Sequence, residues 1–506
     1  MKRRRDIANQ CRRLKQESSG YRGRRREKVS DRTRGAAKSR TRSIVVANVG
    51  EFDVRVMGNA FTADERRLWD DIGIELADMA LFWHGDNKVV VSPRPYESTW
   101  LSDISEWLGF CDIQNLSPEN SAGSLSLDCV TDTRTLNALI ASIQGVQAPE
   151  LITWGVVPST YTLLDALRSS SAVVAPELTP RDALWTVDYL DSKTGFRELC
   201  TKLRLENPDL RVPEGFTCST VDQAIGIASH FIRQGRGFVV KAHQGVAGRG
   251  VLLYPPKKLA VGLDSVRQDL MYWLESDREI HTSLFRNGPL TVEQYIEPAD
   301  DPSLRYPTYD AVITPDGTVK TIGIGAMLVE DQFYQGVVVG DEVFSAAFER
   351  LIVCIGEAVG SAMAGLGYRG WFDVDFVLGA DGYLYATEIN ARRTSPTHAF
   401  EILPIIRARE PRVKCALAND HFELPSASPL SYAMIRSVFA DFQARPPVSD
   451  CFCLPTIVAS LARMNPYVGY LIAGPTYTAV RRAQQVLEEA LNNAVMARNA
   501  IGPLRA

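Results

Sequence analysis

The chain has 506 residues, among them 56 Lys and Arg and 60 Asp and Glu, and 45% of its residues are hydrophobic. This length is too great for one hydrophobic core and predicts about two to four domains. No run of about 18 apolar residues occurs, so neither a transmembrane helix nor a membrane partner is expected. Nine cysteines without CxxC spacing are not typical of a disulfide framework or a zinc site, and they favour a cytoplasmic location.

The first 42 residues form a basic head with 17 Lys and Arg and four Asp and Glu, whereas the rest of the chain is acidic. This head has no apolar periodicity and is predicted to be disordered. It is either an arm that binds nucleic acid through phosphate contacts, or a dispensable segment upstream of the true start. Tyr21 is its only aromatic residue, so stacking on bases is not indicated and nucleic acid is not the expected partner.

Residues 43–181 alternate strand-like and helical patterns, which predicts a Rossmann-like α/β domain with a parallel sheet. No GxGxxG fingerprint occurs in it, so no dinucleotide is assigned. The predicted elements are strands at 44–49, 88–92 and 150–155 and helices at 133–144 and 160–168.

A second, α+β domain is predicted at 182–424, with a lid subdomain at about 196–292, and a small α+β domain follows at 425–506. A homodimer formed through the C-terminal domain is one arrangement that the sequence allows. In the second domain the predicted helices are at 183–205, 221–234, 342–366 and 397–420, and the strands at 237–241, 251–254, 290–296, 308–314 and 318–323. The last domain has a predicted strand at 468–473 and a helix at 476–496.

The most informative segment, residues 371–392, reads as two strands joined by an Asp-Gly turn. Alternation places Asp375, Glu388 and Asn390 within reach of one another on one face. Buried oxygen side chains of this kind favour a cation, and hard oxygen ligands suit Mg²⁺. The alternative is an ordinary surface hairpin with scattered acids.

Gly245, Gly248 and Gly250 lie between two apolar strands, where backbone N–H groups could approach a phosphate and the loop could act as a flap. A strand follows, and no GK[ST] ends the loop, so it is not a P-loop. Lys241 directly precedes the loop and could neutralise phosphate charge, with Lys193 as a second cation. The alternatives are a simple turn and two solvated lysines.

Glu293, Tyr295 and Ile296 end a strand before an irregular acidic segment. An exposed strand end can offer backbone donors and acceptors to an adenine edge. A plain strand end is the alternative, and these residues alone favour it.

Two arginines and a histidine follow the acidic hairpin. Arg392 could hold a phosphoryl oxygen bidentately, and Arg393 could hold a substrate carboxylate. His398 is near enough in sequence to contact substrate, although a single histidine is more often structural.

Over about residues 182–400 the chain resembles the ATP-grasp superfamily. The resemblance rests on the order of five elements: the lysine, the glycine-rich loop, the Glu-x-Tyr-Ile strand end, the Asp-Phe strand and the Glu-Ile-Asn-x-Arg motif. The preceding region resembles its pre-ATP-grasp domain. The body as a whole is similar to the peptide ligases related to that of pheganomycin biosynthesis.

This resemblance implies an ATP-dependent ligase that joins a small-molecule carboxylate to an amino acid or peptide amine through an acyl phosphate, in specialised peptide (antibiotic) biosynthesis. It implies ATP and one or two Mg²⁺ ions, or Mn²⁺ in their place. Lys193 and Lys241 would bind phosphates, and Arg392 would stabilise the transferring group. The flap glycines would close over the nucleotide, Glu293, Tyr295 and Ile296 would sit at the adenine, and Asp375, Glu388 and Asn390 would hold the metal.

Two other functions remain open at this point. A kinase would transfer phosphate to a hydroxyl and release a stable phosphoester. A non-catalytic ATP-binding scaffold could use the basic head to bind nucleic acid.

Overall fold

The computed structural model does not describe the predicted disordered head apart from Arg42, nor Gly248 of the predicted flap. Among the described helices, none combines the length and the apolar character that crossing a bilayer requires. The described residues are 42–55, 63–121, 123–245, 249–261, 263–275, 284–285, 288–330, 332–341, 343–446, 448 and 450–501.

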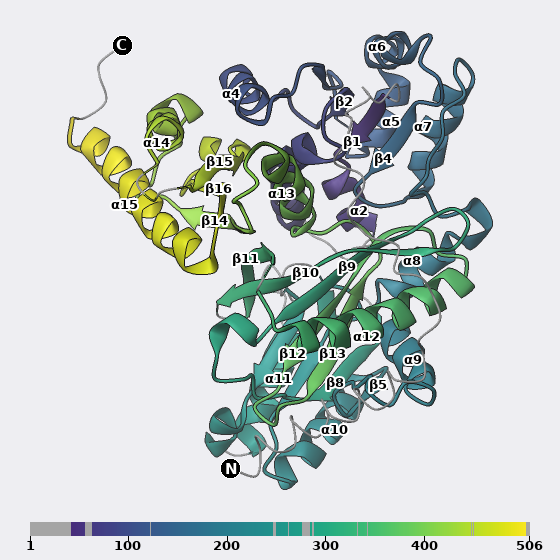
Figure 1. The fold of residues 1–506 in the computed structure, drawn as a ribbon. Helices are drawn as coiled ribbons and strands as arrows, with labels where there is room; N and C mark the ends of the chain where they lie inside the picture. Colours follow the sequence, from purple (N-terminus) through teal and green to yellow (C-terminus); the bar gives the residue numbers. More distant parts are fainter. Residues whose placement is uncertain are drawn as a thin grey trace, which may run out of the picture.

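The N-terminal part is built on a four-stranded parallel sheet in the order β3-β2-β1-β4. Figure 1 labels three of its strands, β1, β2 and β4. Its strands β1 and β2 are buried along their whole length, as expected of a parallel sheet covered on both faces. The predicted Rossmann-like sheet is therefore confirmed. The strands are β1 (Ser43–Val46), β2 (Lys88–Val91), β3 (Ile113–Leu116) and β4 (Glu150–Thr153). The helices are α2 (Val49–Arg55), α3 (Ala63–Leu76), α4 (Ser98–Leu108), α5 (Leu125–Thr131), α6 (Thr133–Ile143) and α7 (Pro158–Arg168).

A second, antiparallel sheet has the order β5-β8-β6-β7. The rings of Phe238 and Tyr254 stack across β6 and β7 with centroids 4.6 Å apart, and Phe231 of α10 is fully buried in the same core. The elements of this part are α8 (Trp185–Leu190), α9 (Lys193–Leu203), β5 (Gly215–Cys218), α10 (Val221–Arg233), β6 (Phe238–Lys241), β7 (Val251–Tyr254), α11 (Leu263–Glu275) and β8 (Leu290–Gln294).

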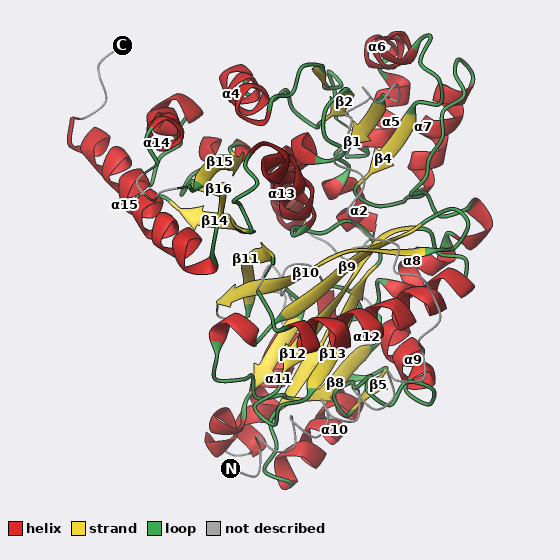
Figure 2. Ribbon diagram, in the orientation of Figure 1, coloured by secondary structure: helices red, strands yellow, loops and turns green. Residues whose placement is uncertain are grey.

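The largest sheet has eight strands in the order β13-β12-β9-β10-β11-β14-β16-β15. Helix α12 crosses one face of this sheet at β9 and β10, and α15 flanks β14 and β16 (Figures 1 and 2). The strands are β9 (Pro307–Ile313), β10 (Val319–Glu330), β11 (Phe333–Gly340), β12 (Gly370–Leu378), β13 (Leu384–Asn390), β14 (Cys415–Glu423), β15 (Phe452–Ile457) and β16 (Tyr467–Gly474). The helices are α12 (Ala346–Gly365), α13 (Thr397–Arg409), α14 (Tyr432–Ala444) and α15 (Tyr477–Ile501).

The predicted helix at 397–420 is wrong beyond Arg409, because residues 415–423 form β14. The run Cys415-Ala-Leu-Ala418 suits either a helix or a buried strand. Pairing with β11 on one side and β16 on the other decides for the strand. One sheet thus continues across residue 424, while the domain divisions themselves stay predictions.

Candidate active site

The hairpin of β12 and β13 brings the predicted oxygen ligands together. Asp375 lies opposite Glu388, and Asp373 lies opposite Asn390. Nδ2 of Asn390 donates to Asp373 Oδ1 at 2.7 Å and to Asp375 Oδ2 at 3.4 Å. Asp373 was missed by the sequence analysis, although its position two residues before Asp375 places it on the same face.

Strand β9 adds a further acid to this face. Asp310 lies opposite Asp373, and Thr308 lies opposite Asp375. Asp310 is fully buried and accepts a hydrogen bond from Trp371 Nε1 at 3.2 Å. Burial and the charge of Asp373 raise the pKa of Asp310 well above its ordinary range. Asp310 belongs to an otherwise ordinary apolar strand, so the sequence carries no signal for it.

Asp375 is the residue of this group that most needs a cation. Burial, then the charges of Asp373 and Glu388, raise its pKa well above the ordinary value. Its buried Oδ1 has no hydrogen-bond partner among the described residues. A cation next to it would relieve both conditions, and carboxylate oxygens are suitable ligands for Mg²⁺.

The oxygen atoms of Asp375 and Glu388, together with the amide oxygen of Asn390, are therefore suitable ligands for a hard cation. Within the part of the chain that the structure describes, no cluster of three or more His, Cys, Asp or Glu side chains forms a ready metal site. The predicted set has only two carboxylates, so the metal role of these three residues stays a prediction.

Lys193 meets the acidic hairpin directly. It is the first residue of α9, and Ser192 caps that helix by accepting a hydrogen bond from Gly195 N at 3.0 Å. Lys193 is only 4% exposed, and its Nζ lies 2.8 Å from Glu388 Oε2. The alternative of a solvated surface lysine is wrong for Lys193, and the phosphate-binding role stays a prediction.

Lys241 is also buried and lies between two sheets. Its Nζ is 2.8 Å from Glu293 Oε2 on β8 and donates to the carbonyl of Thr387 on β13 at 3.1 Å. The other carboxylate oxygen of Glu293 lies 2.8 Å from Arg197 Nη1. Burial acts to raise the pKa of Glu293, but the charges of Lys241 and Arg197 hold it below its ordinary value. A solvated Lys241 is thereby excluded as well.

The residues predicted at the adenine lie where β8 leaves the small sheet. Glu293 is 2% exposed and held in the ion network with Lys241. Tyr295 and Ile296 are half-buried, and the N–H of Tyr295 donates to Gly237 O at 2.9 Å. Their place at the adenine stays a prediction.

The described ends of the glycine-rich loop require glycine. Gly250 has φ +80°, in the left-handed region. A Cβ added to Gly245 would lie 2.3 Å from the carbonyl oxygen of Arg249, which is too close for any side chain. The described ends of the loop therefore approach each other closely, and its role as a flap stays a prediction.

Arg392 is buried and lies two residues after the end of β13. Its Nε lies 3.8 Å from Asp191 Oδ1 and has no hydrogen-bond partner among the described residues. Its guanidinium lies 5.8 Å from the ring centroid of Phe52 and 5.7 Å from that of Trp154. Asp53, also beside it, has a pKa of about 6, raised chiefly by burial. Asp53 and Asp191 were not singled out in the sequence.

Arg393 and His398 are both fully buried. Nη2 of Arg393 donates to both carboxylate oxygens of Glu177 at 2.9 and 2.7 Å, and Nη1 donates to Glu401 at 3.4 Å. His398 Nδ1 lies 2.6 Å from the carbonyl oxygen of Ser395. Their contact with a substrate stays a prediction, and in this structure their partners are protein groups.

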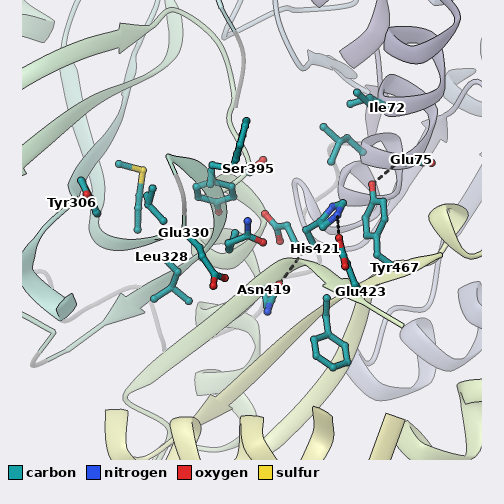
Figure 3. Close-up of a pocket in the computed structure, with 18 of the residues that line it drawn as sticks. Ile72, Glu75, Tyr306, Leu328, Glu330, Ser395, Asn419, His421, Glu423 and Tyr467 are labelled. Atoms are coloured by element: carbon teal, nitrogen blue, oxygen red, sulfur yellow. Dashed lines mark hydrogen bonds and ion pairs between the residues drawn. The ribbon is translucent and has the colours of Figure 1, made fainter. Parts of the chain in front are cut away.

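A cleft of about 1060 Å³ is lined by Ser395, which contacts His398, and none of the predicted site residues that the structure describes is among its lining residues. Figure 3 shows side chains from α3, β10, β14 and β16 around it. Its lining combines apolar side chains with charged side chains of both signs, and the charged groups suit a polar ligand. These charged residues are Glu75, Arg249, Arg305, Glu330, Asp420, Glu423, Arg463, Arg481 and Glu488.

The chain is 30% identical over 212 residues to the L-propargylglycine–L-glutamate ligase of Streptantibioticus cattleyicolor. This match spans 41% of the chain and 42% of that ligase. No family model matches the chain. The similarity confirms the resemblance to a ligase that the sequence motifs predict.

Several solved structures align with most of the chain. An N5-carboxyaminoimidazole ribonucleotide synthetase in complex with ADP aligns over 88% of this chain and 96% of its own, with 11% identity and a TM-score of 0.48. A biotin carboxylase from Campylobacter jejuni aligns over 89% of this chain and 91% of its own, with 13% identity and a TM-score of 0.47. Similarities of this size do not carry an activity from one protein to another.

Proposed function

We propose that this protein is an ATP-dependent ligase that forms an amide bond between a carboxylate and an amine. The observation that carries the proposal is the convergence of two buried lysines on β13, where Lys193 Nζ lies 2.8 Å from Glu388 and Lys241 Nζ donates to the carbonyl of Thr387. Two buried cations next to carboxylates suit a polyphosphate that is bound together with a divalent ion.

In the proposed mechanism, Lys193 and Lys241 bind the phosphates of ATP, and Arg392 offsets charge on the transferring phosphoryl group. The substrate carboxylate attacks the γ-phosphorus, a new O–P bond forms, and ADP leaves. Asp375, Glu388 and Asn390 would hold Mg²⁺, which would supply further charge neutralisation.

The acyl phosphate then reacts with the amine. The amine nitrogen attacks the acyl carbon, the amine loses a proton, and the C–O bond to phosphate breaks to leave the amide. An acyl phosphate hydrolyses readily, so the site must exclude water during the reaction. The loop that contains Gly245 and Gly250 is the proposed cover, because it follows the strand that ends in Lys241.

The test is ADP and phosphate release by the purified full chain with MgATP and pairs of amino acids. L-propargylglycine with L-glutamate is the first pair, because the similar ligase is named for them. The proposal expects ADP release that needs both substrates, equimolar phosphate, and a product mass equal to the two acids minus water. A phosphorylated product without free phosphate would instead establish the kinase alternative.

A further inference from the structure

A second group of unsatisfied polar atoms lies at the cleft, away from the acidic hairpin. Asp420 of β14 lines the cleft and is 5% exposed. Both of its carboxylate oxygens are buried, and neither has a hydrogen-bond partner among the described residues. The hydroxyl of Tyr334 on β11 and Nε2 of His398 on α13 are in the same condition. Buried polar groups are normally satisfied, so several unsatisfied ones together indicate that a partner is absent.

Most atoms of this group are hydrogen-bond acceptors that have no donor partner. Nδ1 of His398 lies 2.6 Å from the carbonyl oxygen of Ser395, so Nδ1 carries the proton and Nε2 of the neutral ring is an acceptor. Nε2 lies 3.3 Å from Asp420 Oδ1, another acceptor. When Asp420 is charged, only the hydroxyl of Tyr334 can donate. A ligand with several N–H groups would satisfy these acceptors.

The charge of the site indicates the same kind of ligand. Burial lowers the pKa of His398 to about 4, so the ring is neutral near pH 7. Burial raises the pKa of Asp420 to about 8, while the neighbouring Tyr334 hydroxyl acts in the opposite direction. A buried carboxylate without a cation is unfavourable, and a ligand cation next to it would stabilise the charged form.

The site is also next to the proposed phosphoryl-transfer centre. Ser395, which lines the cleft, follows Asn390 of the acidic hairpin by only five residues. The pKa of the Tyr334 hydroxyl is raised by burial and by Asp420, and also by the charges of Asp310 and Asp375. The hydroxyl thus lies within electrostatic range of both acidic groups.

We propose that Asp420, together with Tyr334 and His398, binds the primary ammonium group of a substrate in the cleft. The ammonium group offers three N–H donors and one positive charge, which match the acceptors and the charge of this site. The assignment rests on the proposed ligase function for the identity of the ligand as a reactant, but the binding itself needs no turnover.

The test measures binding to the full chain by calorimetry, without ATP. The probes are the twenty common L-amino acids and L-propargylglycine, each compared with its N-acetyl derivative, which lacks the ammonium group. In the wild type, at least one free amino acid should bind about tenfold more tightly than its N-acetyl derivative. Asp420→Asn should remove that difference and leave the binding of the N-acetyl derivative unchanged.

Two further variants sharpen the test. Tyr334→Phe removes one hydroxyl and should weaken the binding of the free amino acid by a smaller factor than Asp420→Asn does. Glu423→Gln is the matched control, because Glu423 is an exposed acid of the same strand and also lines the cleft; it should leave the difference intact.

The proposal is overturned if no probe binds through its ammonium group, or if Asp420→Asn binds the free amino acid as the wild type does. Failure of the ligase proposal has a different result, namely absent ADP release while ammonium-dependent binding remains. Thermal unfolding of each variant shows whether a loss of binding reflects a loss of fold.

Discussion

The ammonium group of Lys193 lies 2.8 Å from a carboxylate oxygen of Glu388. This contact joins the start of α9 to β13, across 195 positions of the sequence. In the absence of a ligand the lysine and the acid neutralise each other. When ATP and a divalent ion bind, we expect Lys193 to pair with a phosphate and Glu388 with the cation.

Glu388→Gln should therefore lower the rate of ADP formation about 100-fold or more, because a neutral amide cannot replace a charged ligand at this centre. The measurement is the initial rate of ADP release with saturating substrates. Glu410→Gln, an exposed acid after α13, is the control and should keep the wild-type rate. An active Glu388→Gln with normal kinetics would contradict the assignment.

Asp375→Asn should separate stability from activity. The substitution removes a buried charge with a raised pKa and an unsatisfied oxygen. We expect a higher melting temperature together with loss of ADP release, the pattern of a site that is strained for function. Thermal unfolding and the ADP assay on the same sample check both parts. A variant that is both less stable and fully active would refute the prediction.

Lys241→Ala should weaken ATP binding by about tenfold, because one buried positive charge near the phosphates is lost. Arg197 remains to pair with Glu293, so the fold should persist. Equilibrium binding of ATP with circular dichroism of the free protein provides the measurement. Lys320→Ala, at an exposed lysine of β10, should bind ATP normally, and equal affinities of both variants would count against Lys241.

Gly250→Ala and Gly226→Ala should change stability in opposite directions. Gly250 has φ +80°, where an alanine is strained by about 1 kcal/mol or more. Gly226 lies in α10 with no atom within 4 Å of an added Cβ, where alanine should stabilise by about 1 kcal/mol. Urea unfolding of both variants tests the contrast. A stabilised Gly250→Ala would show that residue 250 does not require the left-handed backbone conformation.

The buried Asp78 should make stability depend on pH. Its pKa is raised from 3.8 to about 7, chiefly by burial, while hydrogen bonds from Val458 N and Ala459 N act in the opposite direction. The folded state therefore holds the proton more tightly than the unfolded state. The contribution of Asp78 to the free energy of unfolding should fall as pH rises from about 4 to about 7 and stay constant above.

Asp78→Asn should remove this contribution and keep both backbone hydrogen bonds, since one oxygen accepts them both. In urea unfolding, the free energy of unfolding of Asp78→Asn minus that of the wild type should increase from pH 5 to pH 8. Asp441→Asn, at an exposed residue of α14, is the control. A difference in the free energy of unfolding between Asp78→Asn and the wild type that does not change with pH would disprove the raised pKa of Asp78.

The sequence by itself determined the elements whose signal is local. The Asp381-Gly382 turn and the period-two pattern on either side gave the hairpin and three of its polar residues, because both signals depend only on neighbours along the chain. The parallel N-terminal sheet followed from alternating strands and helices in the same way. Glycine at 245 and 250 could be expected at a tight loop, since glycine adopts positive φ and allows close backbone approach without the strain that a side chain adds.

Only the tertiary structure decided which distant groups meet. Pairing with β11 and β16 made a strand of residues 415–423, where a helical pattern was equally acceptable. Asp310 joined the acidic face through the register of β9 with β12, and Asp420 met His398 through the packing of α13 on β14. Strand register and burial are set by contacts between segments far apart in the chain, and no periodicity within one segment encodes them.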